Sequence, residues 1–435
     1  MSLRGLYTLL LALLLTLTSA TVASAASDSD RANPFSYTFN TLAFGTEQYP
    51  SRTTQNPDNA FLNLSRYSTE LDLRSDFYWD QPGVSALFKP RFTSNYQWWE
   101  DGITRGTDYG RSRAFVNEWR VQVNPTEKAF FSFGKEKLLW GPSFIASPSN
   151  ILFKDTEKLN PKSEVEGKYI AKAIYVPNDS VTVNLITETE NQKNGLGETL
   201  KSAQAIKTDV IGSDYQVSVI GFYRERDRFR FGSFGQWTAS DAMLLYYDGI
   251  VSPGTDALYP VTDAASPFGG SFEKKYDNSD KLFLTATAGG SYTFLAGPTL
   301  NLEFLYNGQG YNNREAREYY QIRSNAAAHY FDASQLSGLS RMTLNETFNT
   351  GLPFLRRYYL MSQVQVREIA NVLDLYVRYT HGIEEHAGQA STIAEWRITD
   401  HASLFNINTV STGGRDTEFR SVIDRSSMLG VEVRF

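Results

Sequence analysis

The sequence predicts an all-β fold: a transmembrane, antiparallel, up-and-down β-barrel of about 18 strands, with 16 as the smaller alternative. Three observations support this prediction. The chain is rich in aromatic residues, with 28 Phe, 25 Tyr and 7 Trp, yet its mean hydropathy is negative. After the first 25 residues no apolar run is long enough to form a membrane-spanning helix. Tight turns and longer connections alternate along the whole chain, as expected when a barrel has short turns at one end and loops at the other.

Residues 1–25 have the pattern of a secretory signal. Arg4 supplies the positive charge, residues 9–17 form a short apolar core, and residues 23–25 (Ala-Ser-Ala) form a small-residue cleavage site. We therefore expect an exported chain that begins near Ala26, with a short periplasmic lead at 26–34 and the barrel at 35–435. The absence of Cys excludes a disulfide framework and thiolate metal sites.

Turn chemistry and the two-residue period divide the barrel region into strands. Tight turns are predicted at residues 80–83, 124–127, 177–179, 212–214, 239–241, 296–298, 368–371 and 399–400. Longer connections are predicted at residues 46–66, 100–110, 140–166, 191–201, 225–227, 251–280, 308–353, 382–388 and 412–424. This pattern places both termini at the tight-turn end. A soluble sandwich or propeller is the alternative. A sandwich has no reason to sort its loops by length to one end, and a propeller would show a four-strand repeat, which the sequence lacks.

Within each predicted strand, apolar and charged residues alternate. Leu373, Leu375 and Val377, for example, alternate with Asp374 and Arg378. A charge facing lipid at mid-membrane costs about 2–4 kcal/mol, so we expect the charged faces to point into the lumen. The predicted pore-lining residues are Arg74, Arg91, Arg120, Lys168, Lys172, Arg224, Arg228, Arg230, Arg357, Arg367, Arg378, Arg397, Glu70, Asp72, Asp76, Glu118, Glu303 and Asp374.

The last nine residues form a strand pattern that ends on an aromatic residue. Leu429, Val431, Val433 and Phe435 share one face. This ending resembles the closing strand of Gram-negative outer-membrane β-barrels, in which the terminal aromatic residue is an assembly signal. The resemblance implies an outer-membrane location after Sec-type export, contact with outer-membrane lipid, and recognition of Phe435 by the barrel-assembly machinery. An ordinary edge strand of a soluble sheet is the alternative.

The predicted loop 140–166 is unusually apolar for an external loop. Because eight exposed apolar side chains would form an adhesive patch, we expect it to fold into the lumen as a constriction. Packing on the rim is the alternative. The predicted constriction residues are Trp140, Gly141, Pro142, Ser143, Phe144, Ser147, Ser149 and Asn150, with the three Ser and Asn150 lining the gap. The Trp-Gly-Pro and Ser-Pro-Ser-Asn segments faintly resemble a loop of porin-like barrels of the capsule-assembly type, which are linked to surface polysaccharide.

Three other segments are candidates for controlling the pore. The basic segment 224–230 favours anions, since rings of Arg and Lys attract them, unless neighbouring acids neutralise it. Loop 308–353 contains helix-forming residues at 313–330 that predict a short external helix, either a lid or a rim decoration. Loop 251–280 is a further inward or lidding candidate.

We therefore expect a porin-like channel for passive diffusion of small hydrophilic solutes through a mixed-charge lumen. The lumen would exclude large solutes at the inward loop and carry a field between basic and acidic patches. The alternative is a surface-assembly or export barrel that binds or passes an anionic polysaccharide. We predict no enzymatic activity, no cofactor, no metal site and no nucleic-acid partner, and leave monomer and trimer open. Residues 381–386 place two His near two Glu, but no catalytic motif accompanies them.

Overall fold

A computed structural model describes residues 33–153, 157–158, 160–190, 192–193, 199–200, 202–224, 228–277 and 279–435. The predicted signal 1–25 and lead residues 26–32 lie outside the described residues. No helix among those described is long and apolar enough to cross a membrane.

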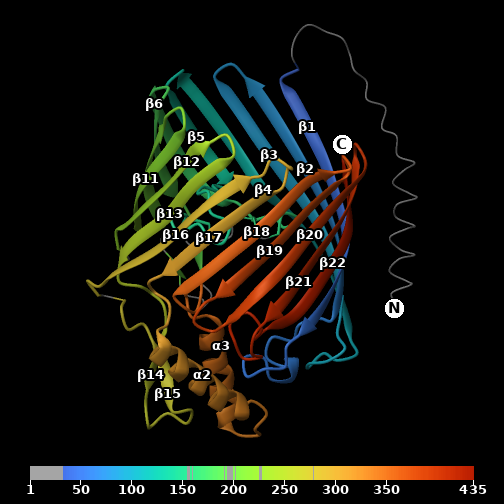
Figure 1. The fold of residues 1–435 in the computed structure, drawn as a ribbon, viewed down its shortest axis with the longest axis vertical. Helices are drawn as coiled ribbons and strands as arrows, with labels where there is room; N and C mark the ends of the chain where they lie inside the picture. Colours follow the sequence, from blue (N-terminus) through green and yellow to red (C-terminus); the bar gives the residue numbers. More distant parts are fainter. Residues whose placement is uncertain are drawn as a thin grey trace.

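The fold is a closed barrel of 18 antiparallel strands (Figure 1). Each strand pairs with the strands adjacent to it along the barrel, and β1 pairs with β22 to close the cylinder. The barrel strands are β1 (Phe35–Pro50), β2 (Tyr67–Gln81), β3 (Val84–Trp98), β4 (Asp108–Thr126), β5 (Ala129–Glu136), β6 (Lys168–Asn178), β7 (Val181–Glu188), β10 (Ala203–Ile211), β11 (Tyr215–Arg224), β12 (Arg230–Ser240), β13 (Met243–Pro253), β16 (Leu282–Thr293), β17 (Thr299–Asn307), β18 (Tyr358–Ile369), β19 (Leu373–Gly382), β20 (Ala387–Thr399), β21 (Ala402–Thr412) and β22 (Ile423–Arg434).

This architecture confirms the predicted fold class and strand count. All eight predicted tight turns fall between consecutive barrel strands, and both ends of the described barrel lie at the tight-turn end (Figure 1). Several boundaries at the loop end differ by a few residues. The largest shift is in β1, which runs to Pro50, past the strand end expected at residue 45, because it pairs with β22 as far as Ile423. We call the opposite end the loop end.

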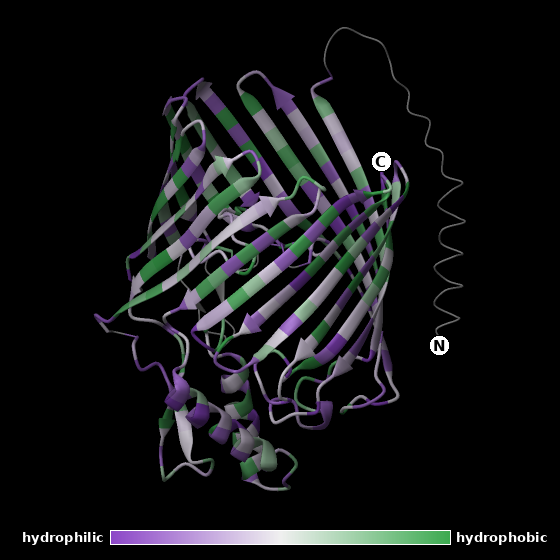
Figure 2. Cartoon of the chain, viewed as in Figure 1, coloured by the Kyte–Doolittle hydropathy of each residue, from purple (hydrophilic) through white to green (hydrophobic). Residues whose placement is uncertain are grey.

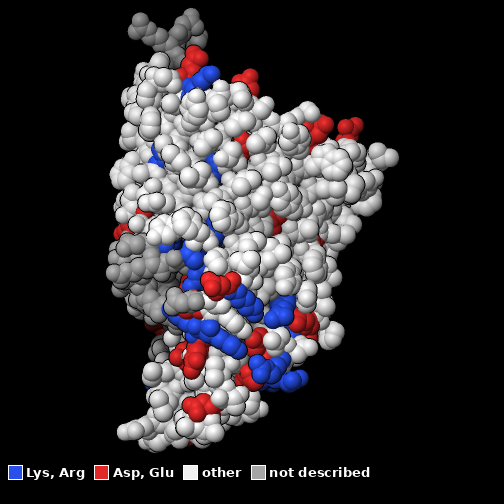
Figure 3. Space-filling view, turned by 90° about the vertical axis from the view of Figure 1, so that its left-hand side faces the viewer, with Lys and Arg blue, Asp and Glu red and all other residues white. Residues whose placement is uncertain are grey.

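Hydropathy alternates along the strands (Figure 2). Outward side chains are apolar and exposed, such as Phe88, Val121 and Leu302. Their inward neighbours are less exposed: Lys89 is half-buried and Glu303 is buried. Charged side chains are sparse across the middle of one outer face and gather toward the loop end, with basic and acidic groups mixed (Figure 3). Exposed aromatic residues occur near strand ends, the positions typical of the girdles of outer-membrane barrels, at Trp79, Trp237, Tyr292, Phe294, Tyr379 and Trp396.

The loop end carries the remaining elements: two-stranded sheets β8 (Gln192–Lys193) with β9 (Thr199–Leu200) and β14 (Tyr259–Thr262) with β15 (Gly270–Glu273), the short helix η1 (Pro57–Asn59), and helices α2 (Asn313–Ala328) and α3 (Gln335–Phe348). Helix α2 confirms that residues 313–330 contain a helix, as predicted. Its N-cap Asn312 accepts hydrogen bonds from the Arg314 and Glu315 amides, and the Glu315 side chain accepts one from the Asn312 amide. Helix α3 and the β14–β15 hairpin were not predicted.

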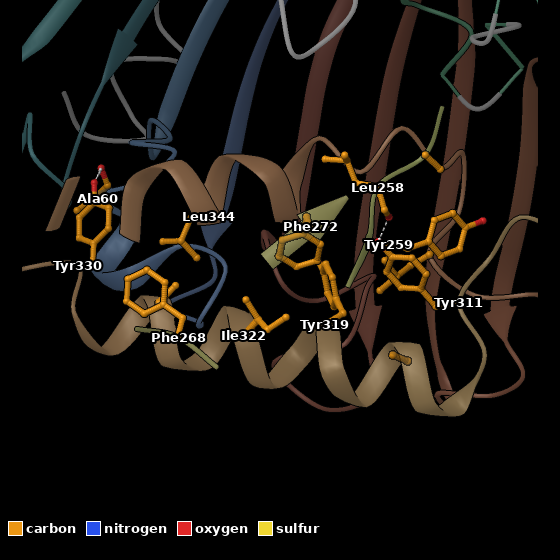
Figure 4. Packing of buried hydrophobic residues seen from close by; sticks show 14 residues of the cluster. Ala60, Leu258, Tyr259, Phe268, Phe272, Tyr311, Tyr319, Ile322, Tyr330 and Leu344 are labelled. Atoms are coloured by element: carbon orange, nitrogen blue, oxygen red, sulfur yellow. Dashed lines mark hydrogen bonds between the residues drawn. The ribbon is translucent and has the colours of Figure 1, made fainter. Parts of the chain in front are cut away.

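The loop-end elements share a core, which we call the cap cluster: α2, α3, β14, β15 and residues 51–66. Tyr319 and Ile322 of α2, Leu344 of α3 and Phe272 of β15 are buried together (Figure 4). The Tyr330 hydroxyl donates to the Ala60 carbonyl at 3.0 Å and ties α2 to the first loop. The cap cluster is therefore a packed unit built from several loops.

Candidate channel and its inward loop

The connection between β5 and β6, residues 137–167, is called the inward loop, because its described residues fold into the barrel (Figure 1). Its described residues contact the inner faces of strands around the cylinder, including β3, β13, β17, β19 and β22. It is three residues longer at its start and one longer at its end than the loop predicted from sequence.

Two carboxylates of the wall hold the first half of the inward loop. Glu303 of β17 accepts hydrogen bonds from the Phe144 amide at 2.6 Å, the Ile145 amide at 2.8 Å and the Ser143 hydroxyl at 3.0 Å. Asp248 of β13 accepts from the Ser149 amide at 2.8 Å and the Ser147 hydroxyl at 2.6 Å. Hydrogen bonds to charged acceptors are the strong ones, and both carboxylates are almost fully buried.

Gly141 explains how the loop reaches Asp248 so closely. Its φ is +89°, and a Cβ at this position would overlap the Asp248 carboxylate and the Ser147 hydroxyl. A glycine is therefore required both by the backbone conformation and by the approach to the wall.

The polar residues expected to line the constriction gap do not do so. Ser143, Ser147, Ser149 and Asn150 are all buried. The hydroxyls of Ser143 and Ser147 bind the wall carboxylates, and the Asn150 amide donates to the Leu138 carbonyl at 2.9 Å. The hydroxyls of Ser143 and Ser147 thus anchor the loop, because buried carboxylates need hydrogen-bond donors.

Basic side chains of the wall hold the second half of the loop. Arg91 binds Glu164 through two nitrogens, at 2.6 and 2.8 Å, and Arg74 donates to the Lys162 carbonyl at 2.6 Å. Lys162 in turn reaches across to Glu432 at 2.6 Å. Arg378 donates to the Lys158 carbonyl at 2.9 Å. Three predicted pore-lining arginines thus hold the inward loop.

One part of the lumen wall is apolar, which the predicted charged lining did not include. Leu152 and Phe153 of the inward loop pack on wall residues that are all buried and inward-facing: Ile170, Ile186, Ala203, Ala205, Ile220, Phe222 and Phe234. Ile170 shares a strand face with Lys168 and Lys172, so the two-residue period does place it in the lumen. The loop and this wall patch cover each other's apolar surface.

The other predicted lining residues form local ion pairs. Lys168 and Arg224 both contact the fully buried Glu188, at 3.2 and 3.1 Å. Arg228 and Arg230 contact Asp256 at the loop end, at 3.4 and 3.6 Å. The remaining close pairs are Lys172 with Glu136, Arg120 with Glu136, Lys89 with Glu118, Arg91 with Asp76, and Arg74 with Asp72, while Glu70 accepts a hydrogen bond from Asn95.

Four predicted residues lie away from the inward loop. Arg357 lies at the loop end, just before β18, where its Nε donates to the Gly310 carbonyl at 3.0 Å. Arg367, Asp374 and Arg397 lie near the tight-turn ends of their strands, and Arg367 and Arg397 are exposed. The structure therefore brings together only part of the predicted set.

A cavity of about 540 Å³ lies between the inward loop and the wall of β1–β4, and we call it the vestibule. Its lining includes Gln48, Ser65 and Gln97 near the loop end of the barrel and Asp72, Arg91 and Lys162 deeper in the lumen. The predicted pore-lining residues were all charged, although the alternation of the strands also assigns uncharged polar residues such as Asn95 and Gln97 to the lumen.

Among the described residues, no group of three or more His, Asp or Glu side chains is placed to hold a metal ion. The two His of the loop at 381–386 have ring centroids 6.5 Å apart.

Three loops at the loop end meet at a partly buried acid, Glu418. The Glu418 carboxylate accepts a hydrogen bond from the Leu355 amide at 2.8 Å and contacts the Tyr359 hydroxyl. Its own amide donates to Glu385 at 3.0 Å. Burial raises the pKa of Glu418 to about 7, so its carboxyl is partly protonated near neutral pH.

No protein-family model matches the sequence, and no curated protein matches it. Solved structures do match over nearly the whole chain. OprD of Pseudomonas aeruginosa, described as an outer membrane protein, is 12% identical with a TM-score of 0.51, over 94% of this chain and 97% of that one. The chain has the fold of an outer-membrane barrel.

Two related structures give similar values. Pseudomonas aeruginosa OccK11 (OpdR) and Acinetobacter baumannii OccAB1 each share 10% identity and a TM-score of 0.52, over 92% of this chain and 96% of theirs. At this identity the likeness concerns the fold. It agrees with the porin-like barrel and the outer-membrane location that the C-terminal strand predicted.

Proposed function

We propose that the protein is an outer-membrane channel through which small hydrophilic solutes diffuse without a chemical step. The apolar exterior suits lipid, and the interior combines polar walls with a partial obstruction. An 18-stranded barrel is too wide for its own wall side chains to fill, so an inward loop is needed to set the size limit.

The vestibule is the observation that carries this proposal. It is a polar cavity of about 540 Å³ that runs along β1–β4 to the inward loop. A solute entering from the loop end would meet hydroxyl and amide groups first and the Arg91–Glu164 pair next. Selection is then by size at the inward loop and by hydrogen bonding along the wall.

The charge arrangement supports weak ion selectivity. The expected field needs separated basic and acidic patches, whereas here the opposite charges are neighbours at 2.6–4.0 Å, as in Arg91 with Glu164 and Arg120 with Glu136. The polysaccharide alternative needs a continuous cationic track, and the pairing of the described wall arginines does not favour one.

Planar-bilayer recording on the purified protein tests the proposal. We expect stable, ohmic single-channel steps with little preference between potassium and chloride. A folded protein that gives no conductance would overturn the channel function. Strong anion selectivity would favour passage of an anionic polymer instead.

A further inference from the structure

We propose that the vestibule is a binding site for uncharged polyhydroxylated solutes, of the size of one or two sugar rings. The inference rests on the proposed function, because it names the class of solute that the channel takes up. It is carried by the charge balance of the cavity, by its uncharged polar lining, and by one unpartnered carboxylate oxygen.

The charges that line the vestibule cancel. Its charged lining consists of four carboxylates and four basic groups: Glu70, Asp72, Glu164 and Glu166, with Arg74, Arg91, Arg113 and Lys162. Each basic group has an acidic neighbour within 3.1 Å, the longest being Arg113 with Glu166. A charged solute would have to separate such pairs, while a neutral solute leaves them intact.

Uncharged hydrogen-bonding groups cover much of the remaining wall. Ser68 pairs across the strands with Gln97, Glu70 with Asn95, and Asp72 with Thr93. Side chains opposite one another lie about 5 Å apart, and those two residues along a strand lie about 7 Å apart. The wall thus carries regularly spaced hydrogen-bond donors and acceptors along the path of the solute. A solute with many hydroxyl groups can pass from one hydrogen-bond partner to the next as it moves.

Asp72 provides a specific acceptor at the deep end of this wall. Asp72 is 7% exposed, and its Oδ2 forms an ion pair with Arg74 at 2.7 Å. Its Oδ1 has no hydrogen-bond partner among the described residues. A buried acceptor without a donor is costly. Asp72 itself lines the vestibule, so a rotation of its carboxylate toward the cavity would let a solute hydroxyl supply the donor. Because Arg74 already balances the charge of Asp72, the site does not require a cation.

Two aromatic rings complete the lining. Phe44 of β1 and Phe115 of β4 both face the cavity. Ligand sites commonly combine a few placed polar groups with aromatic surface, and the C–H faces of a sugar ring can pack on such surface.

The test uses the full-length protein in a planar bilayer, with glucose, gluconate and glucosamine as neutral, anionic and cationic probes. We expect glucose to reduce the ionic current in a saturable manner, and the two charged probes to need higher concentrations for the same block. Asp72→Asn should raise the half-blocking glucose concentration about tenfold, the loss expected for one hydrogen bond to a charged group. Asp400→Asn, in a tight turn outside the vestibule, is the matched control.

The outcomes separate the two proposals. A conducting channel in which glucose gives no saturable block would overturn the binding site and leave the channel function intact. A stronger block by gluconate or glucosamine would also overturn it, as would equal effects of Asp72→Asn and Asp400→Asn. A protein that folds, as judged by heat-modifiable mobility, but does not conduct would overturn the channel function itself.

Discussion

Phe435 and Phe39 exchange two backbone hydrogen bonds across the barrel seam, 2.8 Å from the Phe435 amide to the Phe39 carbonyl and 3.0 Å in the other direction. The last residue of the chain therefore helps to close the cylinder. Its ring is 54% exposed on the outer face and stacks on His401 at a centroid distance of 6.0 Å.

The seam gives the first prediction. Deleting Phe435 should sharply reduce the amount of folded protein in the outer membrane, because it removes both seam hydrogen bonds and the terminal outward aromatic ring. Arg434→Ala should have a small effect, since it keeps the backbone of β22 and removes a side chain that is 65% exposed. Heat-modifiable mobility of outer-membrane fractions measures the difference. Equal, normal levels of both variants would contradict the role of the terminal residue.

The second prediction concerns orientation. Tags at residue 260 in β14 and residue 330 after α2 should be accessible on intact cells, because both lie at the loop end. Tags at residues 178 and 297 should be inaccessible, because they lie in tight turns that we assign to the periplasm. Antibody labelling of intact and permeabilised cells distinguishes the two groups. The reverse labelling pattern would show that the barrel is inserted the other way.

The third prediction concerns the inward loop. Removing residues 144–150 should raise single-channel conductance without unfolding the barrel, since the deletion takes away the part held by Glu303 and Asp248. Glu303→Gln should produce a smaller increase, because a neutral amide keeps the shape but loses charge-assisted hydrogen bonds worth about 1.5–3 kcal/mol each. Asp400→Asn serves as the control. A folded deletion variant with the parent conductance would place the size limit elsewhere.

The fourth prediction concerns pH. The pKa of Glu418 is raised from its ordinary value of 4.5 to about 7, so the folded loops bind a proton that the unfolded loops release. Their stability should therefore be greatest below about pH 4.5 and fall as pH rises to about 7, by at most about 3 kcal/mol for this shift. Limited proteolysis of the loop end should be slower at pH 5 than at pH 8.

Glu418→Gln is the test variant for this pH effect. It carries no titrating group at position 418 and should show little difference between the two pH values. Glu346→Gln is a suitable comparison, because burial also raises the pKa of Glu346, which lies in α3 and not in the loop that carries Glu418. If Glu418→Gln keeps the full pH dependence, another group controls the loops.

Most of the barrel could be predicted from the sequence, but little of the arrangement inside the barrel could be. Strand number and turn positions follow from local turn signals, such as Pro82-Gly83. The start of α2 is indicated by Asn312 and Glu315, which form a capping box. Helix α3 has no comparable signal: its first turns contain Gly338, and its N-cap Ser334 lacks a capping-box partner. The apolar content of the inward loop predicted burial, because exposed apolar surface is costly wherever it lies.

The partners of the inward loop were not predictable from local sequence. Ser143 and Glu303 are 160 residues apart, and Ser147 and Asp248 are 101 apart. Alternation assigns Glu303 to the lumen, but only the closed barrel determines which loop donors reach it. The serines were expected at an open gap for the same reason. The two-residue period of a strand shows whether a side chain faces the lumen, but it does not show which residue lies opposite across the barrel.

The apolar contact between the inward loop and the wall bears on gating. A gate needs two conformations of similar free energy, so that both are populated. Withdrawing the inward loop would expose Ile170, Ile220, Phe222 and Phe234 to water, at roughly 1.5–3 kcal/mol for each side chain. Two such residues alone cost about 3 kcal/mol or more, which leaves fewer than about one molecule in a hundred withdrawn. The inward loop is thus a fixed part of the barrel interior.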